Sequence, residues 1–338
     1  MAKVLITGGA GFVGCNEAGR LMSEGLGVTV LDNLSRPGSA ANLEWLRTQG
    51  DFTFVEGDIR DAVLLGDVLG ARFDVVLHFA AQVAVTTSLA DPMADFETNA
   101  AGTVRLLDAI RTSGSDPLVI YTSTNKVYGS LEDIPLREHP TRWAFRDTPA
   151  GIPETRPLDF HTPYACSKGA GDQYVRDYAR VFGLRTVVLR QSAIYGPRQF
   201  GVADQGWVAW FVRAALLGRP VVIHGDGKQV RDLLYIEDLL DIYARVIERQ
   251  DRAVGRIYNV GGGPSNTLSV LELVAMIEAK TGRRLNCTHG PARPGDQRVY
   301  VSDVGAATRD FGWCPRIGPE EGVGRLVARM ESDPGGLA

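Results

Sequence analysis

The feature that most constrains this chain is a glycine-rich turn that directly follows a short apolar run near the amino terminus. The run Lys3–Thr7 is apolar and partly β-branched, which is typical of a strand buried on both faces. It leads into Gly8, Gly11 and Gly14, which are spaced three residues apart. Gly8 permits a tight turn, Gly11 lets a ligand approach the backbone closely, and Gly14 lets a following helix pack against the strand. The pattern therefore predicts a strand, a tight turn and a helix.

Similar apolar runs recur along the first half of the chain and alternate with amphipathic segments. Further strands are predicted at Val28–Leu31, Phe52–Glu56, Val75–Phe79, Leu118–Thr122 and Thr186–Gln191. Helical periodicity lies between them, as at Thr103–Arg111 and Ser167–Phe182. Alternation of this kind predicts an α/β fold, a doubly wound parallel sheet of Rossmann type with right-handed crossovers.

After about residue 189 glycine and proline become frequent, which predicts a smaller α/β domain that binds substrate. The Rossmann domain is expected at 1–189 with a returning segment near 232–260, and the substrate-binding domain at 190–231 and 261–338. Within the returning segment, Ile257–Val260 is expected to rejoin the main sheet. The Pro-rich stretch Ser130–Pro163 is longer than an ordinary loop, which favours a functional role.

Composition excludes several classes of protein. Lys and Arg total 36 against 40 Asp and Glu, a net charge of -4, so nucleic acid is not expected as a partner. No apolar run approaches the ~18 residues that span a bilayer, so no membrane association is expected. The four cysteines are widely spaced, which excludes a cysteine-based zinc site and disfavours a disulfide framework. With no signal peptide expected, a cytoplasmic location is predicted, and no metal site is expected.

A dinucleotide is expected on the glycine turn, because the N-terminus of the following helix offers free N–H groups to a pyrophosphate. The second predicted strand ends at Asp32, whose carboxylate suits both hydroxyls of an adenosine ribose. It would repel a 2′-phosphate, so NAD is favoured, while nearby Arg36 keeps NADP as an alternative. A glycine-rich turn without a ligand is the competing interpretation. The cofactor is further assigned to Phe12, Val13, Asn33, Ser35, Asp58, Ile59, Phe79, Ala80, Ala81 and Asn99, with helix capping as the alternative for Asp58 and Asn99.

Proton transfer is predicted at Tyr164 and Lys168, whose spacing places both on one face of a helix. A neighbouring ammonium favours the phenolate, although moving a tyrosine pKa from ~10 to neutrality requires about 4 kcal/mol. Thr124 follows a predicted strand at its carboxyl end, where such sheets bind ligands, and is expected to hold a substrate hydroxyl. These three residues are the predicted catalytic group. Tyr164 and Lys168 are also expected to contact the cofactor, and a solvated pair on a helix surface is the alternative.

Together these residues resemble the extended short-chain dehydrogenase/reductase superfamily over nearly the whole chain. The motifs that carry the resemblance are the glycine turn, Asp32, Asn99, Thr124, Tyr164 with Lys168, and the segment 293–296. Within the superfamily the chain looks most like the CDP-paratose 2-epimerases, on the segments 32–36, 123–129, 158–164 and 199–207. The resemblance implies tightly held NAD, a nucleotide-diphosphate sugar as substrate with a CDP-sugar favoured, and a homodimer or homotetramer.

The chain departs from the related 4,6-dehydratases at two positions. Asn125 and Lys126 stand where those enzymes carry an Asp–Glu pair, and neither is a carboxylic acid, so dehydration is disfavoured. A sugar diphosphate needs cations, and guanidinium groups bind phosphate bidentately. The resemblance places phosphate at Arg231 and Arg293, with a solvated surface arginine as the alternative. The predicted substrate-binding residues are Thr124, Asn125, Gln191, Arg198, Gln205, Lys228, Arg231 and Arg293.

The expected function is therefore an NAD-dependent nucleotide-sugar epimerase. Tyr164 removes a proton from a sugar hydroxyl while hydride leaves the same carbon for NAD, and hydride then returns to the other face of the reoriented ketone. Epimerisation of a CDP-hexose at C2 is expected. A UDP-hexose 4-epimerase is the first alternative, and a non-catalytic NAD-sensing protein is the alternative from another class.

Overall fold

A computed structural model of the chain describes residues 2–293 and 295–332, so the end of the predicted second domain, 333–338, and Pro294 lie outside the described residues. The chain forms two compact units. Unit 1 comprises Met1–Thr124, Pro163–Arg190 and Leu240–Tyr258, and unit 2 comprises Asn125–Thr162, Gln191–Leu239 and Asn259–Ala338. This division differs from the predicted one mainly at 125–162, which was expected in the first domain and groups with unit 2.

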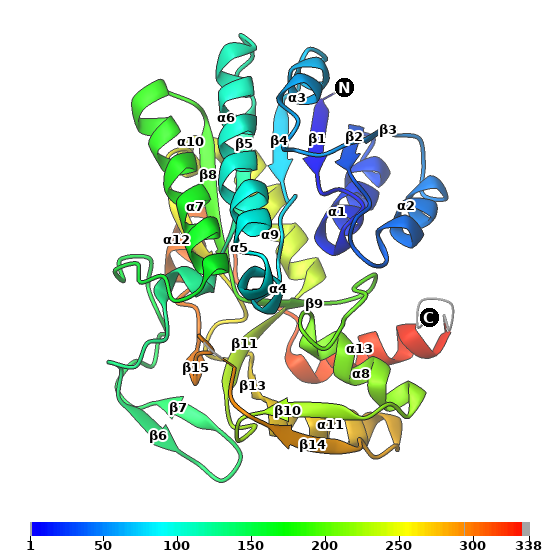
Figure 1. The fold of residues 1–338 in the computed structure, drawn as a ribbon, viewed down its shortest axis with the longest axis vertical. Helices are drawn as coiled ribbons and strands as arrows, with labels where there is room; N and C mark the ends of the chain where they lie inside the picture. The colour runs from blue at the N-terminus through cyan, green and yellow to red at the C-terminus, as the bar shows by residue number, and fades with distance from the viewer. Residues whose placement is uncertain (1, 294, 333–338) are drawn as a thin grey trace. The chain divides into compact units, whose positions relative to one another are not determined.

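Unit 1 is built around a seven-stranded sheet with the order β12-β8-β5-β4-β1-β2-β3 (Figure 1). The strands are β1 (Lys3–Thr7), β2 (Gly27–Asp32), β3 (Thr53–Glu56), β4 (Val75–His78), β5 (Leu118–Thr124), β8 (Thr186–Gln191) and β12 (Ile257–Val260). β1 pairs in parallel with β2 and β4, β2 with β3, and β4 with β5. The predicted doubly wound α/β fold is confirmed, and Ile257–Val260 does return to the sheet as its edge strand.

Helices cover this sheet because each presents an apolar face to the β-branched strands. Val76 and Val119 of the sheet share one core with Leu106 of α6 and Val175 of α7. In Figure 1 these two helices run side by side in front of the strands. The helices that lie wholly in unit 1 are α1 (Phe12–Ser23), α2 (Ser39–Arg47), α3 (Ala62–Leu69), α4 (Val85–Ala90), α5 (Pro92–Phe96), the π-helix η1 (Glu97–Ala101), α6 (Gly102–Thr112), α7 (Pro163–Phe182) and α10 (Gln250–Ala253).

Unit 2 is made of shorter pieces. The strand β11 (Val230–Tyr235) pairs with β9 (Ala193–Tyr195), β13 (Thr267–Ser269) and β15 (Val299–Tyr300), while β10 (Val221–His224) pairs with β14 (Cys287–Gly290). The long stretch predicted to be functional contains a hairpin, β6 (Leu136–Glu138) and β7 (Trp143–Phe145). The helices are the 3-10 turn η2 (Asn125–Tyr128), α8 (Trp207–Leu217), α11 (Val270–Thr281), α12 (Gly305–Phe311) and α13 (Pro319–Ser332), and α9 (Ile236–Glu248) continues into unit 1.

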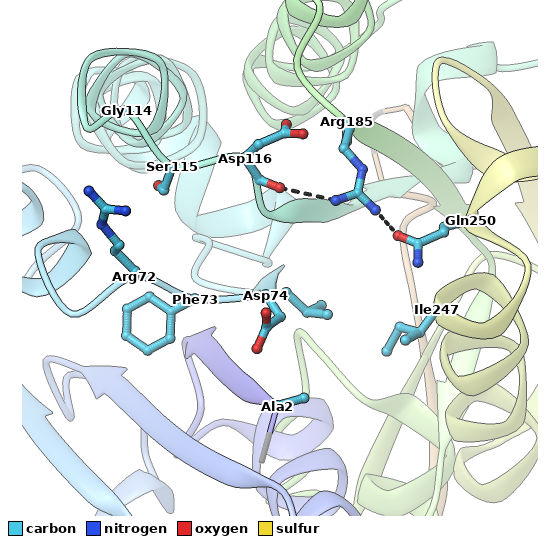
Figure 2. A pocket seen from close by; sticks show the side chains of 11 residues that line it. Ala2, Arg72, Phe73, Asp74, Gly114, Ser115, Asp116, Arg185, Ile247 and Gln250 are labelled. Atoms are coloured by element: carbon cyan, nitrogen blue, oxygen red, sulfur yellow. Dashed lines mark hydrogen bonds between the residues drawn. The ribbon is translucent and has the colours of Figure 1, made fainter.

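A hollow of about 560 Å³ lies in unit 1 beside residues that precede strands (Figure 2). Asp74 comes before β4, Asp116 before β5 and Arg185 before β8. Figure 2 shows Arg185 between the carbonyl of Asp116, to which it donates at 3.0 Å, and the side chain of Gln250. None of the predicted functional residues lines this hollow.

No helix within 2–293 and 295–332 combines the length and the apolar character that crossing a membrane requires. Over the same ranges, no group of three or more His, Cys, Asp and Glu side chains is arranged to hold a metal ion.

Candidate cofactor and proton-transfer site

The glycine turn joins β1 to α1 in the predicted way. Gly8 has a φ of +69°, and a Cβ added there would lie 2.6 Å from the amide nitrogen of Ala80. A Cβ on Gly14 would lie 2.3 Å from the carbonyl oxygen of Gly8, so any side chain would push the helix off the turn. Gly11 is the N-cap of α1 and provides no side-chain cap, which leaves the first helical amides without an intrahelical partner. The predicted residues Phe12 and Val13 open this helix.

Asp32 ends β2 beside the turn and is almost fully buried. Its carboxylate accepts hydrogen bonds from the backbone N–H of Ala10 at 3.0 Å and of Leu34 at 2.8 Å. Burial raises the pKa of Asp32, and these backbone hydrogen bonds oppose that rise. The carboxylate therefore ties the end of β2 to the glycine turn, the position that its predicted ribose contact requires.

A polar cluster lies next to Asp32. Asn33 donates to Asp58 at 2.8 Å and accepts from the hydroxyl of Ser35 at 2.6 Å. The carboxylate of Asp58 also binds Arg60, which holds the pKa of Asp58 at about 2. The N-cap of α3 is Asp61, so the capping alternative for Asp58 is wrong.

The segment after β4 lies against the turn. The N–H of Ala80, in the predicted segment Phe79–Ala81, donates to the hydroxyl of Thr7 at 3.3 Å. Ile59, in contrast, places its side chain in the core of unit 1. Direct contact between Ile59 and the cofactor therefore stays a prediction.

Asn99 is fully buried within the π-helix η1 and caps no helix, so that alternative is wrong. Its amide oxygen accepts from the N–H of Gln82 at 2.8 Å, and its amide nitrogen donates to the carbonyl of Gln82 at 2.9 Å. Asn99 thus fixes the loop that follows β4. Its direct contact with a cofactor stays a prediction.

The structure brings the three predicted catalytic residues together in unit 1. The helix α7 begins at Pro163, so Tyr164 and Lys168 lie one turn apart on the same face. Thr124 is the last residue of β5, and its side chain hydrogen-bonds to Tyr164. Thr124, Tyr164 and Lys168 are only 6%, 9% and 3% exposed, so the alternative of a solvated surface pair is wrong.

The electrostatics of Tyr164 differ from the expectation. Burial raises the pKa of Tyr164 to about 12, while the hydrogen bond from Thr124 and the charge of Arg36 lower it and Asp95 raises it. The sequence predicted that Lys168 would favour the phenolate. Instead the cation that acts on the phenol is Arg36, and burial outweighs its charge because burial removes the phenolate from water.

Lys168 carries a shifted pKa of its own. Burial lowers it to about 7, against the opposing charges of Asp172 and Asp95. The ammonium lies 4.3 Å from the centroid of the Tyr121 ring, a favourable position for a cation. Lys168 is therefore poised to change protonation state near neutral pH.

Apart from Thr124, the predicted substrate-binding residues lie in unit 2, where three cations gather. Arg231 donates to the carboxylate of Asp296, and the Nζ of Lys126 lies 3.2 Å from an oxygen of that carboxylate. Burial lowers the pKa of Lys126, and the charges of Arg231 and Arg293 lower it further. Arg293 lies 3.3 Å from an oxygen of Asp204. Sequence reasoning missed Lys126 as a binding candidate because it judged that position only as a replacement for an acid.

The other predicted substrate-binding residues are dispersed within unit 2. Lys228 pairs with Glu138 of the hairpin at 2.6 Å, and Asn125 donates to Gln297 at 3.3 Å. Gln191 ends β8, Arg198 has a left-handed φ of +66°, and Gln205 forms a backbone bridge with Val202.

A parallel sheet with a helix-opening glycine turn at β1 and an acid at the end of β2 defines a dinucleotide-binding protein of Rossmann type. Residues 4–261 match the NAD dependent epimerase/dehydratase family, and the chain belongs to this family of enzymes. The predicted resemblance and the predicted NAD cofactor are confirmed. The glycine turn fits this cofactor. A Cβ at Gly8 or Gly14 would collide with the backbone, so glycine at both positions permits the tight turn and the close-packed helix. The N-terminus of that helix then offers its free N–H groups to the pyrophosphate.

Relatives of this family match nearly the full length of the chain. A CDP-paratose 2-epimerase from Salmonella typhi is 45% identical, covering 96% of this chain and 98% of its own. A UDP-glucose 4-epimerase from Mycolicibacterium smegmatis (strain ATCC 700084 / mc(2)155) is 34% identical, covering 96% and 97%. The crystal structure of a dTDP-glucose 4,6-dehydratase from Streptomyces venezuelae with NAD and TYD bound superposes with a TM-score of 0.85, at 31% identity and 98% coverage of both chains.

Proposed function

We propose that this enzyme is a nucleotide-sugar epimerase that inverts C2 of a CDP-linked hexose. The observation that carries the proposal is the buried group of Thr124, Tyr164 and Lys168 at the end of β5 and the start of α7. The 45% identity to a CDP-paratose 2-epimerase supports the choice of nucleotide and carbon. Asn125 and Lys126 supply no carboxylic acid, which argues against dehydration.

The residues of unit 1 would hold the cofactor and move one proton. The helix-opening turn at Gly11 would bind the pyrophosphate, Asp32 the adenosine ribose, and Lys168 the nicotinamide ribose. NAD, when bound, supplies an acceptor and later a donor of hydride together with a positive charge. Tyr164, hydrogen-bonded to Thr124, must first lose its own proton, which its raised pKa opposes and the positive charges of Arg36 and of bound NAD favour. As the phenolate it would take the proton of the sugar hydroxyl and return it after the other face of the keto-sugar is reduced. The net redox change is zero.

The residues of unit 2 would bind the substrate diphosphate. Arg231 and Arg293 are the proposed phosphate ligands, and Lys126 joins them because the charges of both arginines act on it. The carboxylate of Asp296 now pairs with Arg231, so an incoming phosphate would compete with that carboxylate for the guanidinium.

The test is incubation of the purified protein with CDP-paratose, CDP-hexoses and UDP-hexoses, with the products resolved by NMR. Inversion at C2 of a CDP-sugar is the expected result. Inversion only at C4 of a UDP-hexose would replace the proposal with the alternative that the 34% identical 4-epimerase supports. No turnover with any of these sugars would reject the proposal.

We also propose a homodimer or homotetramer in the cytoplasm. The neighbouring helices α4, α5 and α7 expose large apolar side chains, Leu89, Met93, Phe96 and Tyr174, which a second copy would cover. The four cysteines are free thiols, as expected in a reducing compartment. Sedimentation of the wild type and of Met93→Glu tests the assembly, since the variant should shift towards monomer. A wild-type monomer would reject it.

A further inference from the structure

The ion pair between Arg190 and Asp172 in unit 1 is almost completely buried. The guanidinium of Arg190 binds the carboxylate of Asp172 through two hydrogen bonds, Nε to Oδ2 at 2.8 Å and Nη2 to Oδ1 at 2.9 Å. The side chains are 3% and 0% exposed. A buried ion pair is weak evidence for stability, because two charges lose their hydration. Its position in the fold suggests another purpose.

The pair joins three elements that carry the predicted catalytic residues or lie next to them. Asp172 follows Lys168 by one turn of α7, and Arg190 lies near the carboxyl end of β8. Ser123, which directly precedes Thr124 in β5, donates to Oδ2 of Asp172 at 2.7 Å. One carboxylate therefore fixes the end of β5, the first half of α7 and the end of β8 to one another.

The charge of the Asp172 carboxylate also acts on Lys168. Among the charges that act on Lys168, Asp172 is the largest one that favours the ammonium, followed by Asp95 of α5. The other titratable groups around Lys168 are His78 of β4, Tyr121 of β5 and Tyr164 of α7. Neither His78 nor Tyr121 supplies a negative charge at neutral pH, because burial lowers the pKa of His78 and raises that of Tyr121.

We propose that Asp172 is a positioning residue of the proton-transfer site. Together with Ser123 and Arg190 it holds Thr124 and Lys168 in one geometry, and its negative charge favours the ammonium form of Lys168. This role rests on the proposed function, since it serves proton transfer between Tyr164 and a sugar hydroxyl. It goes beyond that function because Asp172 touches neither the sugar nor the cofactor in the proposed mechanism.

The direct test follows the titration of Lys168 by NMR in protein labelled with ¹³C at the lysine side chains. The chain has only five lysines, at 3, 126, 168, 228 and 280, so Lys168→Met assigns the signal. In NAD-loaded protein, Asp172→Asn is expected to lower the midpoint of Lys168 by about one pH unit. Asp172→Glu should restore it. Arg190→Gln removes the partner but keeps the carboxylate, so it should not lower the midpoint.

Two further variants separate this role from a general loss of structure. Asp172→Asn combined with Arg190→Gln leaves no unpaired buried charge, and it should lower the midpoint as the single Asp172 variant does. Glu17→Gln breaks another buried pair of unit 1, the one between Glu17 and Arg20 of α1, and should leave the Lys168 midpoint in place. A midpoint unchanged in the double variant, or moved equally by Glu17→Gln, would overturn the proposal.

Kinetics with CDP-paratose then test the two proposals separately. Asp172→Asn should lower kcat by about tenfold or more with little change in KM, and should move the alkaline limb of the pH profile to lower pH. If the wild type has no epimerase activity but the midpoint shift occurs, the proposed function fails and the positioning role stands. If the wild type is active and Asp172→Asn alters neither the midpoint nor kcat, the positioning role fails alone.

Discussion

The candidate site residues of the two units differ in how far they are buried. In unit 1, Thr124, Tyr164 and Lys168 are buried, and the charge of Lys168 is balanced by Asp172 and Asp95. In unit 2, Arg293 and Lys228 are part-exposed cations paired with more exposed carboxylates. Burial fixes one geometry and shifts pKa values strongly, whereas an exposed pair is weak and exchanges partners readily. The difference suits a site that moves a proton in one unit and a site that captures an anion in the other.

A second buried network shows how unit 1 supports its site. His78 contacts the hydroxyl of Thr7 through Nδ1 at 2.7 Å and that of Thr103 through Nε2 at 3.0 Å. Thr103 donates to the carbonyl of Asn99 at 2.6 Å, so it accepts from His78, and Nδ1 of His78 accepts from Thr7. A neutral imidazole thus links the glycine turn to the π-helix.

The largest effect is expected from the phenol of the buried group. Tyr164→Phe should reduce turnover by about 10²–10⁴-fold, because the proton acceptor is gone, while NAD content stays unchanged. Steady-state kinetics measure turnover, and the amount of nucleotide released on denaturation measures the NAD content. Tyr195→Phe removes a buried hydroxyl in unit 2 that has no hydrogen-bond partner among the described residues, and should retain near-normal turnover. Near-normal turnover in Tyr164→Phe would reject its assignment.

The next effect concerns stability in acid. Burial lowers the pKa of His78 to about 3, so the folded state resists protonation that the unfolded chain accepts near pH 6.5. The contribution of neutral His78 to the free energy of unfolding is fully present above about pH 6.5 and is lost as the pH falls towards 3. His78→Gln should be less stable than wild type at pH 7.5, by about 1–3 kcal/mol for its lost hydrogen bonds.

Urea unfolding from pH 7.5 down to 4.5 checks this expectation. The stability gap between wild type and His78→Gln should narrow as the pH falls, because only in the wild type does unfolding expose an imidazole that binds a proton, which favours the unfolded state. A constant gap would contradict a neutral His78.

A smaller effect is expected at the cations of unit 2. Burial raises the pKa of Asp296, but the charges of Arg231 and Lys126 outweigh it and hold that pKa at about 2, so the carboxylate is ionised at neutral pH. Arg231→Met should raise KM for the sugar nucleotide by about 10–100-fold, as expected for a lost charged hydrogen bond. Asp296→Asn should lower KM, because phosphate no longer competes with a carboxylate. Equal KM values in all three proteins would remove Arg231 from the binding site.

The smallest effect is expected at Lys228, which pairs with Glu138 at the hairpin. An exposed pair of this kind contributes about 0–1 kcal/mol, so Lys228→Met should change KM by less than about fivefold. Initial rates at varied substrate concentration measure it beside Arg231→Met. A KM change as large as that of Arg231→Met would place Lys228 among the phosphate ligands, as the sequence first predicted.

Local patterns predicted the elements of unit 1 closely. The strand Lys3–Thr7 and the return of Ile257–Val260 were expected from short apolar runs, and both are observed. The helix α7 begins before the expected Ser167, which places Tyr164 inside its first turn. The grouping of 125–162 with unit 2 was not predicted, because it depends on contacts such as that between Tyr128 and Asn259, 131 residues apart.

The order of residues alone determined the glycine turn, the acid at the end of β2 and the spacing of Tyr164 and Lys168, because each lies within a few residues of the strand or helix that positions it. Only the tertiary structure decided the sign of the Tyr164 pKa shift and the partners of Lys126 and Asp172. Burial and pairing between distant segments depend on how the chain packs, and desolvation is a property of that packing rather than of any local motif.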